Sequence, residues 1–113
     1  MGSSPTSGTQ ALRTLVRVGQ RSVQRKLAQA SSRIKEIREE LRVVDDQLAA
    51  LADDADDKSL RALVSETPAA GHEYREAQRH ADAMRRHRDG LAAELAGLEA
   101  RINELLDKME PAP

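Results

Sequence analysis

Histidine is the side chain best suited to proton transfer or metal binding at neutral pH, and the chain has three: His72, His80 and His87. His80 and His87 are one heptad apart, roughly 10 Å along a helix, which is too far for one metal ion. A helical metal site needs ligands three or four residues apart together with converging carboxylates. Glu76 and His80 have this spacing, but no matching pair precedes them in the chain. We therefore expect a surface Glu–His contact, with no metal and no cofactor.

Four aspartates are the second group that could bind a ligand: Asp53, Asp54, Asp56 and Asp57. A calcium loop would need a glycine at its bend and a bidentate glutamate at its end, and this segment has neither at the required spacing. We predict instead that the four carboxylates lie at the tip of a helical hairpin. There they would form a candidate interaction tip for another protein.

Four arginines recur at intervals of four residues: Arg13, Arg17, Arg21 and Arg25. This Arg rail is a candidate binding surface for phosphates, nucleic acid or an anionic membrane. No aromatic residue interleaves with the arginines to stack on bases. We expect the rail to be a solvated face that pairs with the acidic end of the second helix, and we keep nucleic acid and membrane as alternatives.

Features that an enzyme would need are missing from the sequence. The 113 residues include no cysteine, which excludes a thiolate nucleophile, a disulfide and a Cys-ligated zinc site. No Gly-rich phosphate loop and no nucleophile elbow is present. A pair of helices also has no enclosed pocket that excludes water. We therefore predict a non-enzyme without a small-molecule substrate.

The elements that position these groups follow from the composition. The chain has no Phe, no Trp and one tyrosine, whereas 33% of its residues are charged. A globular core relies on aromatic side chains for buried area, so this composition is typical of a coiled coil. We predict one all-α domain, a long antiparallel two-helix coiled-coil hairpin.

The predicted elements are separated by polar, acidic or proline-containing segments. Thr67 and Pro68 have the residue types of an N-cap and a first helical position, so the second helix is expected to begin there. The acidic run before it is a poor helix end, because negative charge lies at the negative end of the helix dipole. The organisation that we predict is a flexible tail at 1–9, a first helix at about 10–53, a connector with a short helical segment at 54–67, a second helix at about 68–109, and a C-terminal tail at 110–113.

Apolar residues in both predicted helices alternate at spacings of three and four, which is the heptad repeat of a two-stranded coiled coil. Ala30, Ala77 and Ala81 share this pattern, and Gln20 and Arg88 interrupt it. The other seam residues are Val16, Val23, Leu27, Ile34, Ile37, Leu41, Val44, Leu48, Leu51, Tyr74, Met84, Leu91, Leu95, Leu98, Ile102, Leu105 and Met109. The register that we predict places Leu27 opposite Leu98, Ile37 opposite Arg88, and Leu51 opposite Tyr74. Any shift by one heptad also pairs seam with seam, but leaves a terminal heptad without a partner.

The distribution of charge favours the antiparallel arrangement. Residues 1–38 carry seven more positive than negative charges, and residues 39–57 carry seven more negative than positive ones. Folding back lays the basic start of the first helix beside the acidic end of the second, whereas a parallel homodimer would align the basic segments with each other. Leu12, Leu15, Val18 and Val43 lie off the seam, so we expect two hairpins to associate into a four-helix homodimer.

The acidic run and the stretch Glu73-Tyr74-Arg75-Glu76-Ala77 together resemble the N-terminal coiled coil of Gre-type transcript cleavage factors. The resemblance covers about a dozen residues. It implies a hairpin that enters the RNA polymerase secondary channel and holds a metal with the carboxylates at its tip. Gly71 and His72 stand where that family usually has an Asn, and its globular C-terminal domain has no counterpart here.

The function that we expect is therefore a non-enzymatic coiled-coil module, a scaffold, adaptor or regulator that binds other proteins through a helix face or the tip. The alternatives are an RNA polymerase-associated factor and a nucleic-acid or anionic-surface binder that uses the Arg rail. No apolar run approaches the roughly 18 residues of a membrane span, and no signal-peptide pattern begins the chain. We therefore expect a cytoplasmic protein.

Overall fold

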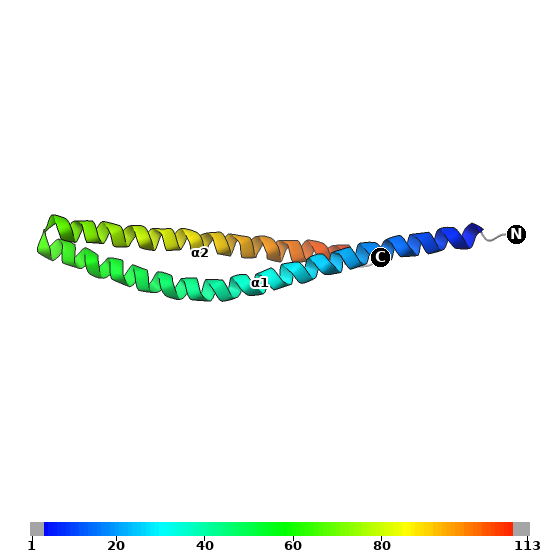
Figure 1. The fold of residues 1–113 in the computed structure, drawn as a ribbon, viewed down its shortest axis with the longest axis horizontal. Helices are drawn as coiled ribbons and strands as arrows, with labels where there is room; N and C mark the ends of the chain where they lie inside the picture. Colours follow the sequence, from blue (N-terminus) through cyan, green and yellow to red (C-terminus); the bar gives the residue numbers. More distant parts are fainter. Residues whose placement is uncertain (1–3, 110–113) are drawn as a thin grey trace. The chain divides into compact units, whose positions relative to one another are not determined.

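The computed structural model describes the backbone of residues 4–109 and the side chains of residues 11–13, 16–17 and 19–109. Two helices make up this part of the chain: α1 spans Ser4–Ser65 and α2 spans Pro68–Met109 (Figure 1). No strand occurs among the described residues. The predicted fold class, an all-α antiparallel two-helix hairpin, is confirmed.

The hairpin divides into two compact units, each built from a piece of both helices. One unit is Lys35–Ala96 and contains the turn between α1 and α2. The other combines the described residues up to Ile34 with those from Gly97 onward. The predicted C-terminal tail, 110–113, lies outside the described residues, as do the first three residues of the predicted N-terminal tail.

Helix α1 is longer at both ends than the predicted range of 10–53. Its backbone is helical from Ser4 and stays helical through the acidic run, so no connector precedes Ser65. Two ion pairs within the helix explain why the acidic run does not end it: Lys58 Nζ lies 3.1 Å from Asp54 Oδ2, and Arg61 Nη2 lies 3.1 Å from Asp57 Oδ2. Pairs at this spacing stabilise a helix by roughly 0.3–0.5 kcal/mol each.

The turn consists of Glu66 and Thr67 and is closed by a cap on each side. Glu66 has a φ of 51°, in the left-handed region, and its N–H donates to the carbonyl of Ala62 at 3.2 Å. This is the αL motif that ends many helices, here with a residue other than glycine. On the other side, Thr67 Oγ1 accepts a hydrogen bond from the N–H of Ala70 at 3.2 Å. Thr67 is therefore the N-cap of α2, and Pro68 is the first helical residue.

The core of the unit Lys35–Ala96 lies along the seam between the two helices. Ile37 is fully buried, with an exposed fraction of 0%. Ala55 is also buried, so the seam of α1 continues past Leu51 into the segment predicted as a connector. The other buried seam residues of this unit are Val44, Ala77, Ala81 and Leu91, and the half-buried ones are Leu41, Leu48, Leu51, Tyr74, Met84 and Leu95.

Contacts across this unit show that the predicted register is wrong by one heptad. Arg88 Nε donates to Asp45 Oδ1 at 3.1 Å. In the predicted register Arg88 lies opposite Ile37, and a shift of eight residues to Asp45 corresponds to roughly 12 Å along the helix. An arginine opposite Ile37 is too far away to form this bond. Arg88 therefore lies beside the α1 segment around Val44 and Asp45.

The residues that line a shallow hollow between the helices indicate the same shift of the register by one heptad. Leu51, Asp54 and Lys58 line it from α1, and the side chains that line it from α2 are Glu73, Glu76, Ala77 and His80. Leu51 thus lies beyond Tyr74, toward Ala77 and His80. The error has a physical reason: a shift by one heptad keeps seam facing seam, so only the position of the turn distinguishes the registers. Because α1 continues to Ser65, the turn comes later than predicted.

The other unit has its own short core. Ala30, Ile34 and Leu105 are buried, and the half-buried seam residues around them are Val23, Leu27, Leu98, Ile102 and Met109. Val16 belongs to the predicted seam but is 59% exposed. Figure 1 shows why, since the start of α1 extends past the end of α2. The shifted register therefore leaves the first turns of α1 without a partner helix.

Neither helix has, within the described residues, a stretch long and apolar enough to cross a membrane.

Candidate interaction surfaces

The most exposed large apolar side chains near the turn belong to the last turns of α1. Leu60, Leu63 and Val64 are 64%, 72% and 85% exposed. Their spacing of three and four residues places them on one face of the helix. We call Leu60, Leu63 and Val64 the terminal apolar cluster. Ala62, between them in sequence, is half-buried, so the seam of the helix faces inward and the cluster faces outward. The three side chains form an aliphatic ridge that faces solvent.

Charges of both signs surround this terminal apolar cluster. Asp56 and Asp57 lie about one turn before Leu60, Lys58 follows them, and Arg61 lies within the cluster, directly after Leu60. Arg61 already pairs with Asp57, and Lys58 pairs with the preceding Asp54. The local field is therefore mixed, and neither polyanions nor polycations would be attracted strongly.

The four aspartates of the predicted interaction tip do not lie at the tip. Asp53, Asp54, Asp56 and Asp57 are all exposed on the side of α1. The turn at Glu66 comes about two and a half to three and a half helical turns after them. The reason is that α1 continues through the acidic run, and the segment that the turn presents is apolar.

The histidines make two contacts, and neither is the predicted one. His72 Nε2 lies 3.9 Å from Glu76 Oε2, within α2, and His87 Nε2 lies 3.5 Å from Glu40 Oε1, across the two helices. His80 lines the shallow hollow together with Glu76. In the part of the chain that the structure describes, no three His, Asp or Glu side chains are grouped closely enough to hold a metal ion.

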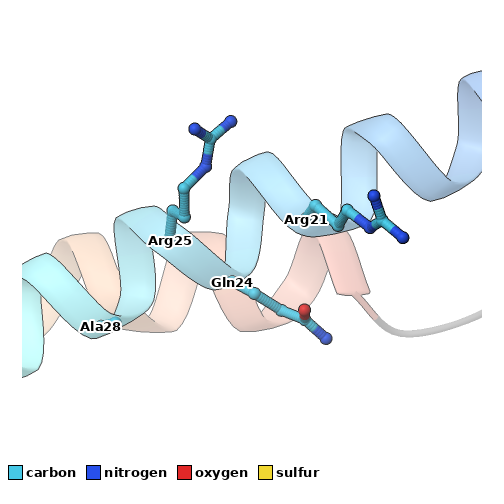
Figure 2. A pocket seen from close by; sticks show the side chains of 4 residues that line it. All are labelled: Arg21, Gln24, Arg25 and Ala28. Carbon is cyan, nitrogen blue, oxygen red and sulfur yellow. The ribbon is translucent and has the colours of Figure 1, made fainter.

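The side chains of the Arg rail are all exposed on α1. Figure 2 shows Arg21, Gln24 and Arg25 extending from the helix in different directions. These residues and Ala28 line an open depression on the surface of α1, not an enclosed site. In the described part of the chain, the rail makes no hydrogen bond or ion pair with another described residue, so the expected pairing with acidic residues of α2 is not found there.

An apolar strip lies next to the first residues of the rail. Leu12 is 65% exposed and Val16 is 59% exposed, and both line a second open depression with Arg13 and Arg17. Gly19 and Val23 continue the same helical spacing. The side chains of Leu15 and Val18, which the sequence also places off the seam, lie outside the described residues. Val43, the fourth residue predicted off the seam, is 49% exposed.

The terminal apolar cluster was not among the predicted site residues. Its sequence signal is visible in retrospect: Leu60, Leu63 and Val64 follow an acidic run but do not fit the heptad positions of the seam. An apolar residue off the seam is as often a scattered surface residue as a binding residue, so the spacing alone does not identify a surface. The structure adds the continuous helix and the nearby turn.

No family model matches the chain, and neither the curated proteins nor the solved structures contain a match to it.

Proposed function

We propose that this chain is a non-enzymatic interaction module that binds a partner protein through the terminal apolar cluster of α1. The observation that supports this is the exposure of Leu60, Leu63 and Val64 on one face of a helix. Three large aliphatic side chains grouped in this way are unfavourable in water, and burying each fully would stabilise a complex by roughly 1.5–3 kcal/mol before the costs of association.

The partner that fits this surface is an amphipathic helix. Side chains spaced three and four residues apart form a ridge, which packs into the groove of another helix. The mixed charges of Asp56, Asp57, Lys58 and Arg61 favour a protein over a nucleic acid or a lipid surface, because both of these carry charge of one sign. Hydrogen-bonded caps at Glu66 and Thr67 close the turn directly after the ridge.

The Gre-type interpretation has no comparable support. It requires carboxylates at the turn, and the aspartates lie on the side of α1. Asp54 and Asp57 are also paired within the helix. We therefore do not propose polymerase binding through an acidic tip.

The decisive experiment compares the chain with a variant of the cluster, Leu60→Gln/Leu63→Gln/Val64→Gln. Glutamine keeps helix propensity high, so the fold is retained. The control carries Val43→Gln/Leu106→Gln, which changes apolar residues that are 49% and 46% exposed elsewhere on the helices. Each protein is used to capture partners from the cell extract, and a photo-activated cross-linker at position 63 identifies what touches the cluster.

Two results together would support the proposal. One protein cross-links at position 63, and the same protein, once purified, binds the chain and the control at least about tenfold more tightly than it binds the cluster variant. The same captured partner with equal affinity for all three proteins contradicts the proposal. Light scattering on the pure chain tests the expected homodimer. If the cross-link joins two copies of the chain, the occupant of the cluster is a second copy and the partner-helix proposal fails.

A further inference from the structure

We propose that the first turns of α1 bind the surface of an anionic lipid bilayer, with the Arg rail at the headgroups and Leu12 and Val16 inserted beneath them. This inference concerns the end of α1 that carries no terminal apolar cluster and does not depend on the partner protein proposed above. It rests on the charge of the segment, on the exposure of its arginines, which form no hydrogen bond or ion pair with another residue among those that the structure describes, and on an exposed apolar strip on the same turns.

The charge of the segment is of one sign. No acidic residue precedes Glu36, whereas the rail and Lys26 bring five positive charges into residues 13–26. Each basic side chain near an anionic membrane surface adds to the electrostatic attraction. The rail arginines are exposed, and none of them is engaged with another residue in the described part of the chain. They are therefore available for phosphate groups.

The apolar strip distinguishes a lipid surface from other polyanions. Leu12, Val16, Gly19 and Val23 follow one another at spacings of three and four, which gives an amphipathic helix with a period of 3.6 residues. One of the two heptad positions in each of these turns is polar, Arg13 and Gln20, while Val16 and Val23 hold the other, so the segment is a weak seam for another coiled-coil helix. Helices that lie in a membrane interface bury a broad apolar face and keep basic residues at its edges.

The position of the segment in the fold leaves this face accessible. Leu12 and Val16 are 65% and 59% exposed because α1 begins beyond the end of α2 (Figure 1). A nucleic acid would use the arginines but not the two apolar side chains, and no aromatic residue is present there to stack on bases. A second copy of the chain that docked through the same segment would bring an identical basic segment and would be repelled.

The experiment is co-sedimentation of the full chain with sucrose-loaded vesicles at low salt. Vesicles of phosphatidylcholine with about one third phosphatidylglycerol are compared with vesicles of phosphatidylcholine alone. Two variants separate the contributions: Arg13→Gln/Arg17→Gln/Arg21→Gln/Arg25→Gln removes the rail, and Leu12→Gln/Val16→Gln removes the strip. All changed residues are exposed, and circular dichroism checks that helix content is kept.

Matched controls carry the same kinds of change elsewhere. Val43→Gln/Leu106→Gln matches the strip variant, and the rail variant is matched in net charge by Arg61→Gln/Arg75→Gln/Arg79→Gln/Arg86→Gln, all exposed. We expect binding to the anionic vesicles only, at least about tenfold weaker for each of the two test variants, and unchanged for both controls.

Three outcomes would overturn the proposal. The first is equal binding to neutral and anionic vesicles. The second is loss of binding in the charge-matched control as large as in the rail variant, which would mean that net charge acts and not the rail. The third combines two results: the strip variant binds the anionic vesicles as tightly as the unchanged chain does, and a duplex oligonucleotide binds the chain more tightly than the vesicles do. Together these results would assign the rail to nucleic acid.

Discussion

Arg88 of α2 and Asp45 of α1 are joined across the hairpin by a hydrogen bond of 3.1 Å between Nε and Oδ1. Arg88 occupies a seam position, yet its side chain is 44% exposed because the guanidinium extends out of the seam to the carboxylate. A second contact, to Asp89 at 3.2 Å, keeps it at the surface. This pair fixes which segment of α1 lies beside α2.

A charge swap tests the register directly. Asp45→Arg and Arg88→Asp are each expected to destabilise the hairpin, because each places like charges beside one another. The double variant restores the opposite charges. Its loss of unfolding free energy should therefore be smaller than the sum of the two single losses by roughly 0.5 kcal/mol, the usual coupling of an exposed pair. Urea unfolding followed by circular dichroism measures all four proteins. Simple additivity would mean that the two residues are not neighbours in solution.

Glu66 is the one residue other than glycine with positive φ in the described chain, at 51°. An L side chain in this region costs roughly 1–2 kcal/mol, whereas glycine adopts it freely. The greater entropy of glycine in the unfolded chain offsets part of this gain, so the net effect of Glu66→Gly is expected to be a rise of about 1 kcal/mol in the free energy of unfolding. The control is Glu66→Gln, which removes the charge at the end of α1 but keeps the strained conformation. If Gln stabilises as much as Gly, charge and not backbone strain is the cause.

Two glycines of α2 weaken the helix without serving a contact. A Cβ at Gly90 or at Gly97 would meet no atom within 4 Å. Alanine should therefore stabilise each position by roughly 0.5–1 kcal/mol. Thermal unfolding of Gly90→Ala, Gly97→Ala and the double variant checks both the sign and the expected additivity. A loss of stability in either single variant would show that its surface is occupied in solution.

The seam should be sensitive to truncation where it is fully buried. Ile37 is 0% exposed, and Ile37→Ala is expected to cost roughly 2–4 kcal/mol through lost burial and the cavity that remains. Val43 is 49% exposed, and Val43→Ala on the same helix should change stability by less than about 0.5 kcal/mol. Leu105, which is 1% exposed, provides the corresponding test in the other unit. Equal effects for Ile37 and Val43 would place the seam on another face.

The sequence was sufficient for those features that depend on a local pattern. Helix type and the antiparallel arrangement follow from the heptads and the charge, and the first residues of α2 follow from Thr67 and Pro68. The end of α1 was not predictable in the same way. Its acidic run opposes the helix dipole, whereas the pairs that Lys58 and Arg61 make within the helix and the burial of Ala55 against α2 favour continuation of the helix.

The candidate surfaces depended on that same boundary. With a turn predicted after Asp53, the aspartates formed the tip and Leu60 belonged to a connector. With the turn at Glu66, the aspartates lie on the side of α1, and the start of α1 loses its partner helix. Exposure of Val16 and of the terminal apolar cluster follows from the length of one helix, which no local pattern encodes.

The capped turn at Glu66 and Thr67 also has a consequence for the folding reaction. Registers that differ by one heptad are competing traps, because the seam stabilises each of them to a similar degree. A turn that closes first, through its local hydrogen bonds, would select the native register before the long helices can pair elsewhere. Folding would then proceed by zipping from the turn toward the termini, and residues near Ala62 and Ala70 would be ordered earliest in the transition state.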